Sequence, residues 1–259
     1  MILYLSGTGN SRKVAERLSH NLSESLYFIP EINPAELEYT GKSLGIVCPV
    51  YAWGISPLVL DFINRLSKRF IDSASQQPVW IVLTCGDETA YAPEILKRSL
   101  QSVGLSVTGG WSVIMPNDYV LLPGFDVDSK DVEQDKLSRY VEAVDEISAS
   151  ISAQEWWEDY VRGSMPWIKS KLVYPLFVRW GVNPGRWHWT QECIGCAKCT
   201  TVCPVSNIDF KSGRPRWGNN CISCTACFHI CPTHAVEYGN ITRHKHQYRT
   251  LLRSLRTRS

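Results

Sequence analysis

The chain has 259 residues, of which 44% are apolar and 20% are charged. This length and composition exclude a mini-protein, a disordered chain and a fibrous repeat, and they predict two modest packed domains. The net charge of +2 hides an asymmetry. Residues 1–150 carry 12 Lys and Arg against 19 Asp and Glu, whereas residues 151–259 carry 15 against 6. No uncharged apolar run reaches about 18 residues, so we expect no transmembrane segment.

Cysteine is the unusual residue of this chain, with ten copies, most of them near the C-terminal end. The N-terminus shows no charged region, apolar region and cleavage site of a secretion signal. We therefore expect a cytoplasmic protein. In a reducing compartment, clustered thiols indicate metal ligands in preference to disulfides.

The first half alternates short apolar runs, expected as strands, with amphipathic stretches, expected as helices. The expected strands are Ile2–Leu5, Leu26–Ile29, Leu44–Val50, Val79–Cys85 and Val107–Met115. The expected helices are Ser11–Asn21, Pro57–Arg69, Tyr91–Val103 and Lys130–Ile151. Residues 30–43 leave room for only a short second helix, because Pro30, Pro34 and Gly41 interrupt them. The alternation predicts an α/β domain over residues 1–153, with a five-stranded parallel sheet covered by helices on both faces.

The second half differs from the first in composition, being rich in aromatic, cysteine and basic residues. Residues 154–188 are expected to form an aromatic-rich linker that packs, because residues 156–189 hold six of the ten tryptophans, broken by glycines and prolines. A small α+β domain is expected at residues 189–239, where the cysteines cluster, and a basic tail at residues 240–259.

Two copies of one cysteine spacing stand in the expected second domain. Each reads Cys-x2-Cys-x2-Cys-x3-Cys-Pro, the spacing of bacterial-type ferredoxins with two [4Fe–4S] clusters. Three closely spaced thiolates can wrap three corners of a cubane, and the fourth ligand then comes from the other repeat. We therefore expect one cluster on Cys193, Cys196, Cys199 and Cys231, and a second on Cys221, Cys224, Cys227 and Cys203.

Zinc is the alternative occupant, since Cys-x2-Cys pairs also occur in zinc ribbons. The third Cys of each run and the following Cys-Pro do not fit a zinc ribbon, so we favour iron–sulfur clusters. Each expected set has all four cysteine ligands, so no iron atom would be left open for a substrate. This indicates that the clusters relay electrons. His229 and His234 lie inside this domain and are expected as surface or packing residues.

A polar, glycine-rich loop follows the first expected strand and leads into a helix. It reads Ser6, Gly7, Thr8, Gly9, Asn10 and Ser11. Such a loop directs N–H groups and hydroxyls at one point, where the helix dipole favours an anion, so it predicts a phosphate site. The Walker motif does not fit, and Arg12 stands where the dinucleotide fingerprint needs its third glycine. An ordinary strand-to-helix turn is the alternative.

Two further loops follow the third and fourth expected strands, at the sheet edge where open α/β sheets bind ligands. Their N–H groups and aromatic side chains suit a flat isoalloxazine ring, so the three loops together predict FMN. Ordinary packing is the alternative for Tyr51, Trp53 and Tyr91. Cys48 and Cys85 are expected as buried small apolar residues. The predicted cofactor residues of these loops are Pro49, Val50, Tyr51, Ala52, Trp53, Gly54, Thr84, Cys85, Gly86, Asp87 and Tyr91.

The three loops resemble those of flavodoxin, a fold with the strand order 2-1-3-4-5. The resemblance implies that residues 6–11 are the phosphate loop and that Tyr51 or Trp53 stacks on the ring. It also implies that residues 85–87 and Tyr91 surround the pyrimidine edge.

A flavodoxin-like domain followed by a two-cluster ferredoxin domain resembles the EFR family of flavodoxin–ferredoxin fusion proteins. Pro49-Val50-Tyr51 and Met115-Pro116-Asn117 add to the resemblance. It implies FMN, two [4Fe–4S] clusters and electron transfer, typically in anaerobes.

An FMN ring takes two electrons in single steps and each cluster carries one, so we expect a protein that converts between one- and two-electron transfer. No second nucleotide fingerprint is present, so we expect a protein redox partner as electron donor or acceptor. One alternative is an FMN-dependent reductase, with Asp118, Tyr119 or Tyr91 as proton donor. The other alternative is a module that senses redox state or iron.

The basic half has no acidic residue in residues 160–189 or 240–259. This charge suits an acidic redox partner or peripheral contact with an anionic membrane, and a solvated tail is the alternative. No nucleic-acid partner is expected, because the acidic first domain would oppose it. A short basic amphipathic helix is expected from the helical spacing of Tyr248, Leu251, Leu252 and Leu255.

Overall fold

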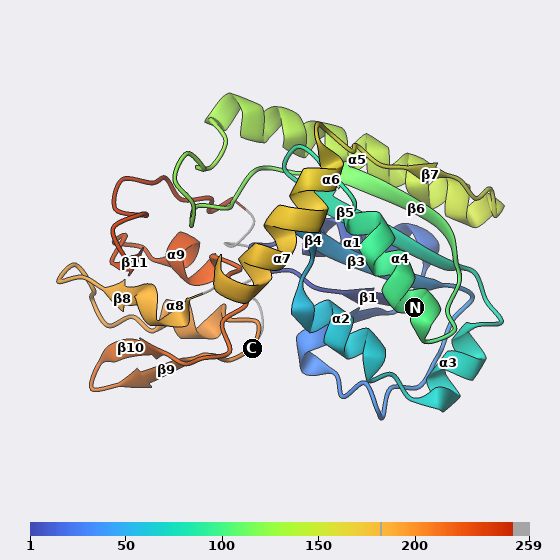
Figure 1. Cartoon of the computed structure of the whole chain (residues 1–259), viewed down its shortest axis with the longest axis horizontal. Coiled ribbons are helices and arrows are strands. Elements are labelled where there is room, and N and C mark those ends of the chain that lie inside the picture. The colour runs from blue at the N-terminus through green and yellow to red at the C-terminus, as the bar shows by residue number, and fades with distance from the viewer. Residues whose placement is uncertain (182, 251–259) are drawn as a thin grey trace.

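The computed structural model describes residues 1–181 and 183–250. Its larger part is a sheet with helices on both faces, and a smaller cysteine-rich part lies at one end (Figure 1). The strand order is β2-β1-β3-β5-β6-β7, and β4 pairs with β3 off this path. The strands are β1 (Ile2–Tyr4), β2 (Leu26–Phe28), β3 (Leu44–Tyr51), β4 (Gly54–Ile55), β5 (Val79–Cys85), β6 (Val107–Ile114) and β7 (Glu158–Asp159).

The five expected strands are present and parallel, and β2-β1-β3-β5-β6 is the 2-1-3-4-5 order of a flavodoxin-like α/β fold. Two short strands go beyond the expectation. β4 folds back antiparallel onto β3, and β7 adds a parallel edge beside β6. Each has two residues, which is too short to produce a readable alternation of apolar and polar side chains.

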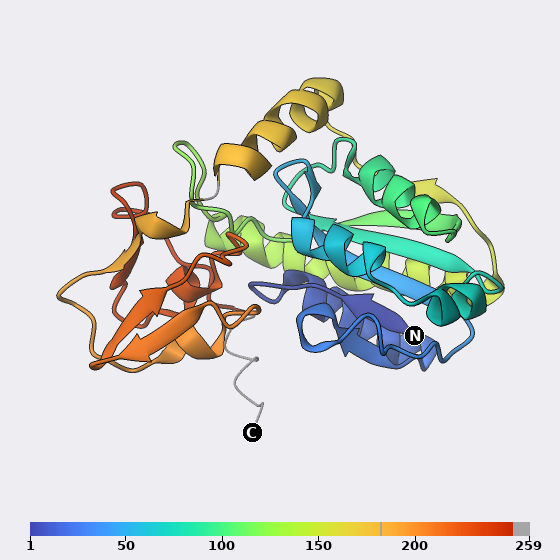
Figure 2. The same ribbon diagram turned by 60° about the horizontal axis from the view of Figure 1, so that its bottom comes forward.

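Helices cover both faces of the sheet, and each layer buries an apolar core (Figure 2). On one face, Val14 and Val144 of two neighbouring helices pack over Trp80. On the other face, Phe62 and Leu96 contribute to the second core. The helices are α1 (Asn10–Leu22), α2 (Pro57–Asn64), α3 (Lys68–Ala74), α4 (Ala92–Ser102) and α5 (Lys130–Ala153).

Two local expectations in this domain need correction. The single helix expected at Pro57–Arg69 is wrong, because α2 ends at Asn64 and α3 starts anew. The Ser67 hydroxyl accepts a hydrogen bond from the Phe70 N–H and caps the new helix. Within residues 30–43 the expected short helix is reduced to the end of a 3-10 turn, η1 (Ile29–Glu31).

A helix of about four turns occupies the middle of the segment expected as an irregular linker. It runs without a break through α6 (Pro166–Ile168), η2 (Lys169–Val173), α7 (Tyr174–Leu176) and η3 (Phe177–Gly181). The stretches η2 and η3 have π-helical turns. Pro175 lacks an N–H, and wider turns on either side accommodate its ring. We call residues 166–181 the bridging helix.

The smaller domain is built from two short antiparallel pairs and two short helices. β8 pairs with β11, and β9 pairs with β10. A separate apolar cluster around Phe228, Trp187 and Tyr238 fills its interior. The elements are β8 (Trp187–Trp189), α8 (Lys198–Thr201), β9 (Ile208–Lys211), β10 (Arg214–Trp217), α9 (Ala226–Ile230) and β11 (Val236–Tyr238).

Residues 240–250, expected as part of a tail, pack against both domains. Tyr248 is fully buried, and its hydroxyl donates a hydrogen bond of 2.8 Å to Asn10 Oδ1 in the first domain. Lys245 Nζ donates to the Leu122 carbonyl at 2.9 Å. The alternative of a solvated tail is therefore wrong for these residues, and no helix forms in them. Leu251, Leu252 and Leu255 of the expected tail helix lie outside the described residues.

None of the helices in residues 1–181 and 183–250 has both the length and the hydropathy needed to cross a membrane.

Candidate functional site

A cavity of about 450 Å³ opens at the carboxyl ends of β1, β3, β5 and β6. All three loops predicted from the sequence contribute to it. The predicted residues that line it are Ser6, Gly7, Thr8, Asn10, Ser11, Pro49, Val50, Tyr51, Ala52, Trp53, Thr84, Cys85, Gly86 and Asp87.

Three predicted residues do not line the cavity. Gly9 lies one position behind it, as the N-cap of α1 with a φ of 107°. Gly54 packs against the Tyr174 ring of the bridging helix. The Tyr91 ring faces Arg162, whose guanidinium lies 5.6 Å from the ring centroid, and the Tyr91 N–H donates to Ser170 of the bridging helix at 2.9 Å.

The first loop gathers hydrogen-bond donors at the start of α1. The Ser6 hydroxyl accepts from the Gly9 N–H at 3.1 Å, which closes the turn. Ser11 and Thr84 share a hydroxyl hydrogen bond of 2.7 Å and so link two of the loops. The Asn10 amide donates to the Pro116 carbonyl at 2.9 Å. These contacts hold the loop at the start of α1, where the sequence predicts an anion site.

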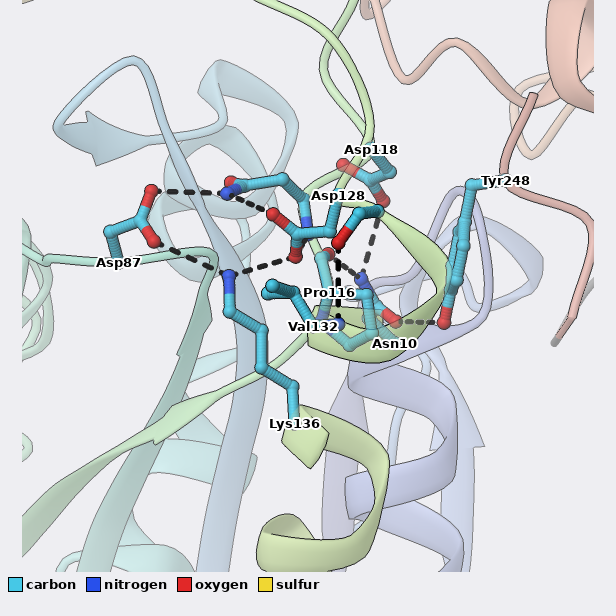
Figure 3. A network of polar contacts seen from close by, with 10 residues as sticks. Asn10, Asp87, Pro116, Asp118, Asp128, Val132, Lys136 and Tyr248 are labelled. Atoms are coloured by element: carbon cyan, nitrogen blue, oxygen red, sulfur yellow. Dashed lines mark hydrogen bonds and ion pairs between the residues drawn. The ribbon is translucent and has the colours of Figure 1, made fainter. Parts of the chain in front are cut away.

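Asp118 is a residue of this loop region that does not fit a phosphate. Its carboxylate accepts a hydrogen bond from Thr8 and one from Asn10, two residues of the predicted phosphate loop. Figure 3 shows the contact with Asn10. Burial raises the pKa of Asp118 to about 6. A negative charge at this position would repel a phosphate, and protonation of Asp118 would remove the repulsion.

The second loop is a tight hairpin between β3 and β4. Ala52 and Trp53 both have positive φ, which is the two-residue turn that matches the twist of the flanking strands. The Trp53 indole donates to Glu88 at 2.7 Å. This bond fixes the ring at the cavity edge.

The third loop depends on a close approach at Gly86. A Cβ atom there would lie 1.6 Å from Asn117 Oδ1. The Asn117 amide donates to Asp87 and to Asp128, at 3.0 Å each. Lys136 forms ion pairs with the same two carboxylates (Figure 3). The ionic contact with Lys136 and the hydrogen bonds from Asn117 hold the pKa of Asp128 below its usual range, against the effect of burial.

The cavity also has walls that the loop motifs did not indicate. Val173 and Phe177 of the bridging helix line it, and the Phe177 ring lies 5.3 Å from the Tyr51 ring. The hydroxyls of Tyr119 and Ser56 are buried beside it without a hydrogen-bond partner in the described chain. Apolar walls with a few unsatisfied polar groups fit a flat cofactor with polar edges.

The eight repeat cysteines surround two small cavities in the second domain. The first is lined by Cys193, Cys196, Cys199 and Cys231, which we call set I. The second is lined by Cys203, Cys221, Cys224 and Cys227, which we call set II. In each set three cysteines come from one repeat and the fourth from the other, which is the crossing pattern expected from the spacing.

Each crossing cysteine has a backbone hydrogen-bond donor that suits a sulfur with negative charge. The N–H of the residue four positions after each crossing cysteine points at its sulfur. Asn207 N lies 3.2 Å from Cys203 Sγ, and Ala235 N lies 3.2 Å from Cys231 Sγ. Such hydrogen bonds stabilise sulfur that carries negative charge.

Set II has two additional donors. The indole N–H of Trp187 is directed at the Cys221 sulfur and that of Trp217 at the Cys227 sulfur, and both tryptophans line the set II cavity. Their rings stack at 6.1 Å with an interplanar angle of 16°. Buried indole N–H groups normally find an acceptor. The sulfurs of a cluster at set II would supply one.

Set II also borders the main cavity. Residues 222–225, which include Cys224, form part of the main cavity wall. A Cβ atom on Gly7 would lie 2.5 Å from Cys224 Cβ and 3.2 Å from Cys224 Sγ. The absence of a side chain at Gly7 therefore lets the predicted phosphate loop touch a predicted cluster ligand.

His229 holds the two domains together at this contact. It is fully buried, donates from Nε2 to the Asp118 carbonyl at 2.7 Å and accepts at Nδ1 from the Tyr248 N–H at 3.0 Å. This bonding requires the neutral ring, and burial lowers the pKa of His229 to about 4. Of the two expected alternatives, a surface residue or a packing residue, His229 is therefore a packing residue. Cys48 and Cys85 are also buried, and burial raises the pKa of each thiol to about 12.

The second domain matches a known protein family. Residues 192–236 match the family model of the 4Fe-4S dicluster domain. Because this match covers only the cysteine-rich segment, it says nothing about residues 1–191. Comparison with curated proteins finds no match.

Several solved structures are similar to about half of this chain at low identity. The Trp repressor binding protein from Bacillus subtilis has 16% identity and a TM-score of 0.37, covering 55% of this chain and 96% of that one. The two-electron reduced flavodoxin of Megasphaera elsdenii has 15% identity and a TM-score of 0.35, covering 43% and 85%. The NAD(P)H:quinone oxidoreductase from Methanothermobacter marburgensis has 12% identity and a TM-score of 0.36, covering 56% and 94%.

Proposed function

We propose that this protein transfers electrons between a protein redox partner and FMN by way of two [4Fe–4S] clusters. FMN binds in the main cavity, and the clusters bind at set I and set II. When bound, these groups supply the conversion between two-electron and one-electron transfer. The resemblance to the EFR family agrees with this function.

The wall shared by the two sites carries this proposal. Gly7 belongs to the predicted phosphate loop and Cys224 to set II, and they are in contact. Ser223 and Thr225, on either side of Cys224, face the same cavity. A protein in which cluster and flavin worked separately would not need this contact.

The chain provides a surface through which electrons can reach set I. Cys196 is exposed, and the neighbouring Ile194 is 65% exposed. Cys224 and Cys227 of set II, in contrast, share a cavity with Trp187 and Trp217, and Cys224 lies against Gly7 of the first domain. We infer the order partner, set I, set II, FMN, and the reverse for electrons leaving the protein.

A second candidate is an FMN-dependent reductase of a small molecule. Asp118 favours it, because this residue lies on the cavity wall with a pKa of about 6 and can hold or release a proton near neutral pH. Tyr119 lies beside it on the same wall. Tyr91, which faces Arg162 instead, is no longer a proton-donor candidate.

Anaerobic purification followed by counting of iron, acid-labile sulfide and flavin tests the cofactor content. We expect about eight iron atoms and one FMN per chain. Zinc, or iron without acid-labile sulfide, would contradict the iron–sulfur assignment. Reversible reduction without turnover of small molecules supports electron transfer, whereas steady turnover of a quinone or azo compound supports the reductase.

A further inference from the structure

The bridging helix has two unlike faces. Its inner face is tied to the first domain. Ser170 donates a hydrogen bond of 2.6 Å to the Trp53 carbonyl, and Tyr174 donates one of 2.6 Å to the Ile55 carbonyl. Phe177 is buried and lines the main cavity. These bonds fix the orientation of the helix, so its outer face is held toward solvent (Figure 2).

The outer face consists of apolar and basic residues alone. Trp167 is 62% exposed, Leu172 is 54% exposed and Trp180 is 66% exposed. Met165 precedes the helix and extends the same surface. The outward residues of the helix are Trp167, Ile168, Lys171, Leu172, Pro175, Leu176, Arg179 and Trp180.

We propose that this outer face docks the protein on the surface of an anionic lipid bilayer. Leu172 and Leu176 would enter the boundary between headgroups and acyl chains, with Trp167 and Trp180 at the two ends of the buried strip. Lys171 and Arg179 would contact the lipid phosphates. An interfacial helix combines these features, namely Trp and Leu in the apolar region and Lys or Arg at its margin.

Other occupants of this face are less consistent with its chemistry. A second copy of the same face would bring Lys171 and Arg179 against like charges. A protein partner is normally recognised through a rim of hydrogen-bonding residues, and the outer face of residues 166–181 has no acidic or neutral polar side chain. Two further cations of this region, Lys169 and Arg162, are paired with Glu88 and Glu94, so they do not contribute free charge.

The inferred surface does not depend on cofactor content, because it is formed by the outer side of the helix. Its position nevertheless matters for the site. Val173 and Phe177 line the main cavity from the inner side of the same helix. Docking would therefore hold the cavity wall formed by Val173 and Phe177 close to the membrane, with only the bridging helix between them.

Flotation of the full-length protein with vesicles tests the proposal. We expect binding to vesicles of phosphatidylcholine and phosphatidylglycerol, weaker binding to phosphatidylcholine alone, and weakening by salt. The double variant Leu172→Asp/Leu176→Asp should reduce vesicle affinity by about tenfold or more, because two apolar side chains leave the bilayer. Val132→Asp, on the exposed surface of α5, is the matched control and should bind as the unmodified chain does.

A charge-reversal variant guards against misfolding of the aspartate variant. Lys171→Glu/Arg179→Glu leaves the apolar packing intact and should abolish the preference for anionic vesicles. Absence of vesicle binding by the unmodified protein would overturn the proposal, as would undiminished binding by the aspartate variant. Loss of a dimer in the aspartate variant, without vesicle binding by either protein, would assign the face to a second copy of the chain instead.

Discussion

The two cysteine sets share one spacing but lie in different surroundings. Set I faces solvent at Cys196 and has no indole in its wall. Set II lies under Trp187 and Trp217 and touches the main cavity through Cys224. Each crossing cysteine receives the same backbone hydrogen bond, so the sets differ in their neighbours and not in their ligands.

Under the proposed function, this difference would give the two copies of one motif separate roles. A cluster at an exposed set can exchange electrons with a partner. A cluster beneath indole donors, beside the flavin cavity, would be the easier of the two to reduce, since hydrogen bonds to sulfur stabilise the added negative charge. Electrons from a partner would then move inward.

The largest expected effect comes from removing a crossing ligand. Cys203→Ala should eliminate the set II cluster and lower the iron content from about eight to about four atoms per chain. The matched variant Cys231→Ala should eliminate the set I cluster instead. Iron analysis combined with electron paramagnetic resonance distinguishes the two. Loss of the set I signal in Cys203→Ala would contradict the crossing pattern.

The contact between Gly7 and Cys224 can be disturbed by a substitution at Gly7, which leaves every predicted cysteine ligand in place. Gly7→Ala places a Cβ atom 2.5 Å from Cys224 Cβ, so we expect the free energy of unfolding to fall by about 1–3 kcal/mol. Urea unfolding measures this change. Gly185→Ala is the control, because its nearest neighbour is a side-chain oxygen of Asn183 at 3.3 Å. Equal stability of both variants would show that the domains do not touch at Gly7.

The next prediction concerns Asp118, which lies in the wall of the main cavity near set II. Because its pKa is about 6, the carboxylate is charged above pH 6 and would oppose an FMN phosphate in the predicted phosphate loop. We expect Asp118→Asn to bind FMN about tenfold more tightly at pH 7.5. In the unmodified protein the affinity should fall as the pH rises through 6, and in the variant this part of the pH dependence should be absent.

Riboflavin, which has no phosphate, provides the control ligand for this prediction. Its affinity should change little between the two proteins. An equal gain for riboflavin and FMN would mean that Asp118 acts on the ring or the ribityl chain and not on the phosphate.

The smallest expected effect concerns the indole donors. Trp217→Phe removes one N–H and retains an aromatic ring beside Trp187. The loss of a hydrogen bond of about 1 kcal/mol should lower the one-electron potential of the set II cluster by about 40 mV. Trp189→Phe is the control, because this indole is half-exposed and lines neither cysteine cavity. Equal potentials in both variants would exclude the indole hydrogen bond.

The sequence was sufficient where a pattern is local. The apolar runs from Ile2 to Ile114 predict the five parallel strands, because buried strands are read from short continuous segments. The loops at the strand ends then identify just under half of the residues that line the cavity. The cysteine spacing predicts which residues share a cavity, because a run of three ligands leaves the fourth to the other repeat.

Features that depend on contacts between residues far apart in the chain could not be predicted from the sequence. Gly7 and Cys224 are more than two hundred positions apart, so no local pattern indicates that their loops touch. Pro175 and Gly181 suggest an irregular linker, yet the inner face of the bridging helix finds partners on the first domain that outweigh helix propensity. Tyr248 has the spacing of a helix face, but its burial site lies between two domains.

Rapid one-electron reduction of the loaded protein tests the central claim that set II connects set I with FMN. A pulse of reductant is applied anaerobically, and absorbance at cluster and flavin wavelengths is followed. In the unmodified protein we predict that cluster absorbance recovers as flavin absorbance falls, at a rate independent of protein concentration. In Cys203→Ala this phase should be absent. A flavin phase that depends on protein concentration, or that persists unchanged in Cys203→Ala, would contradict a path through set II.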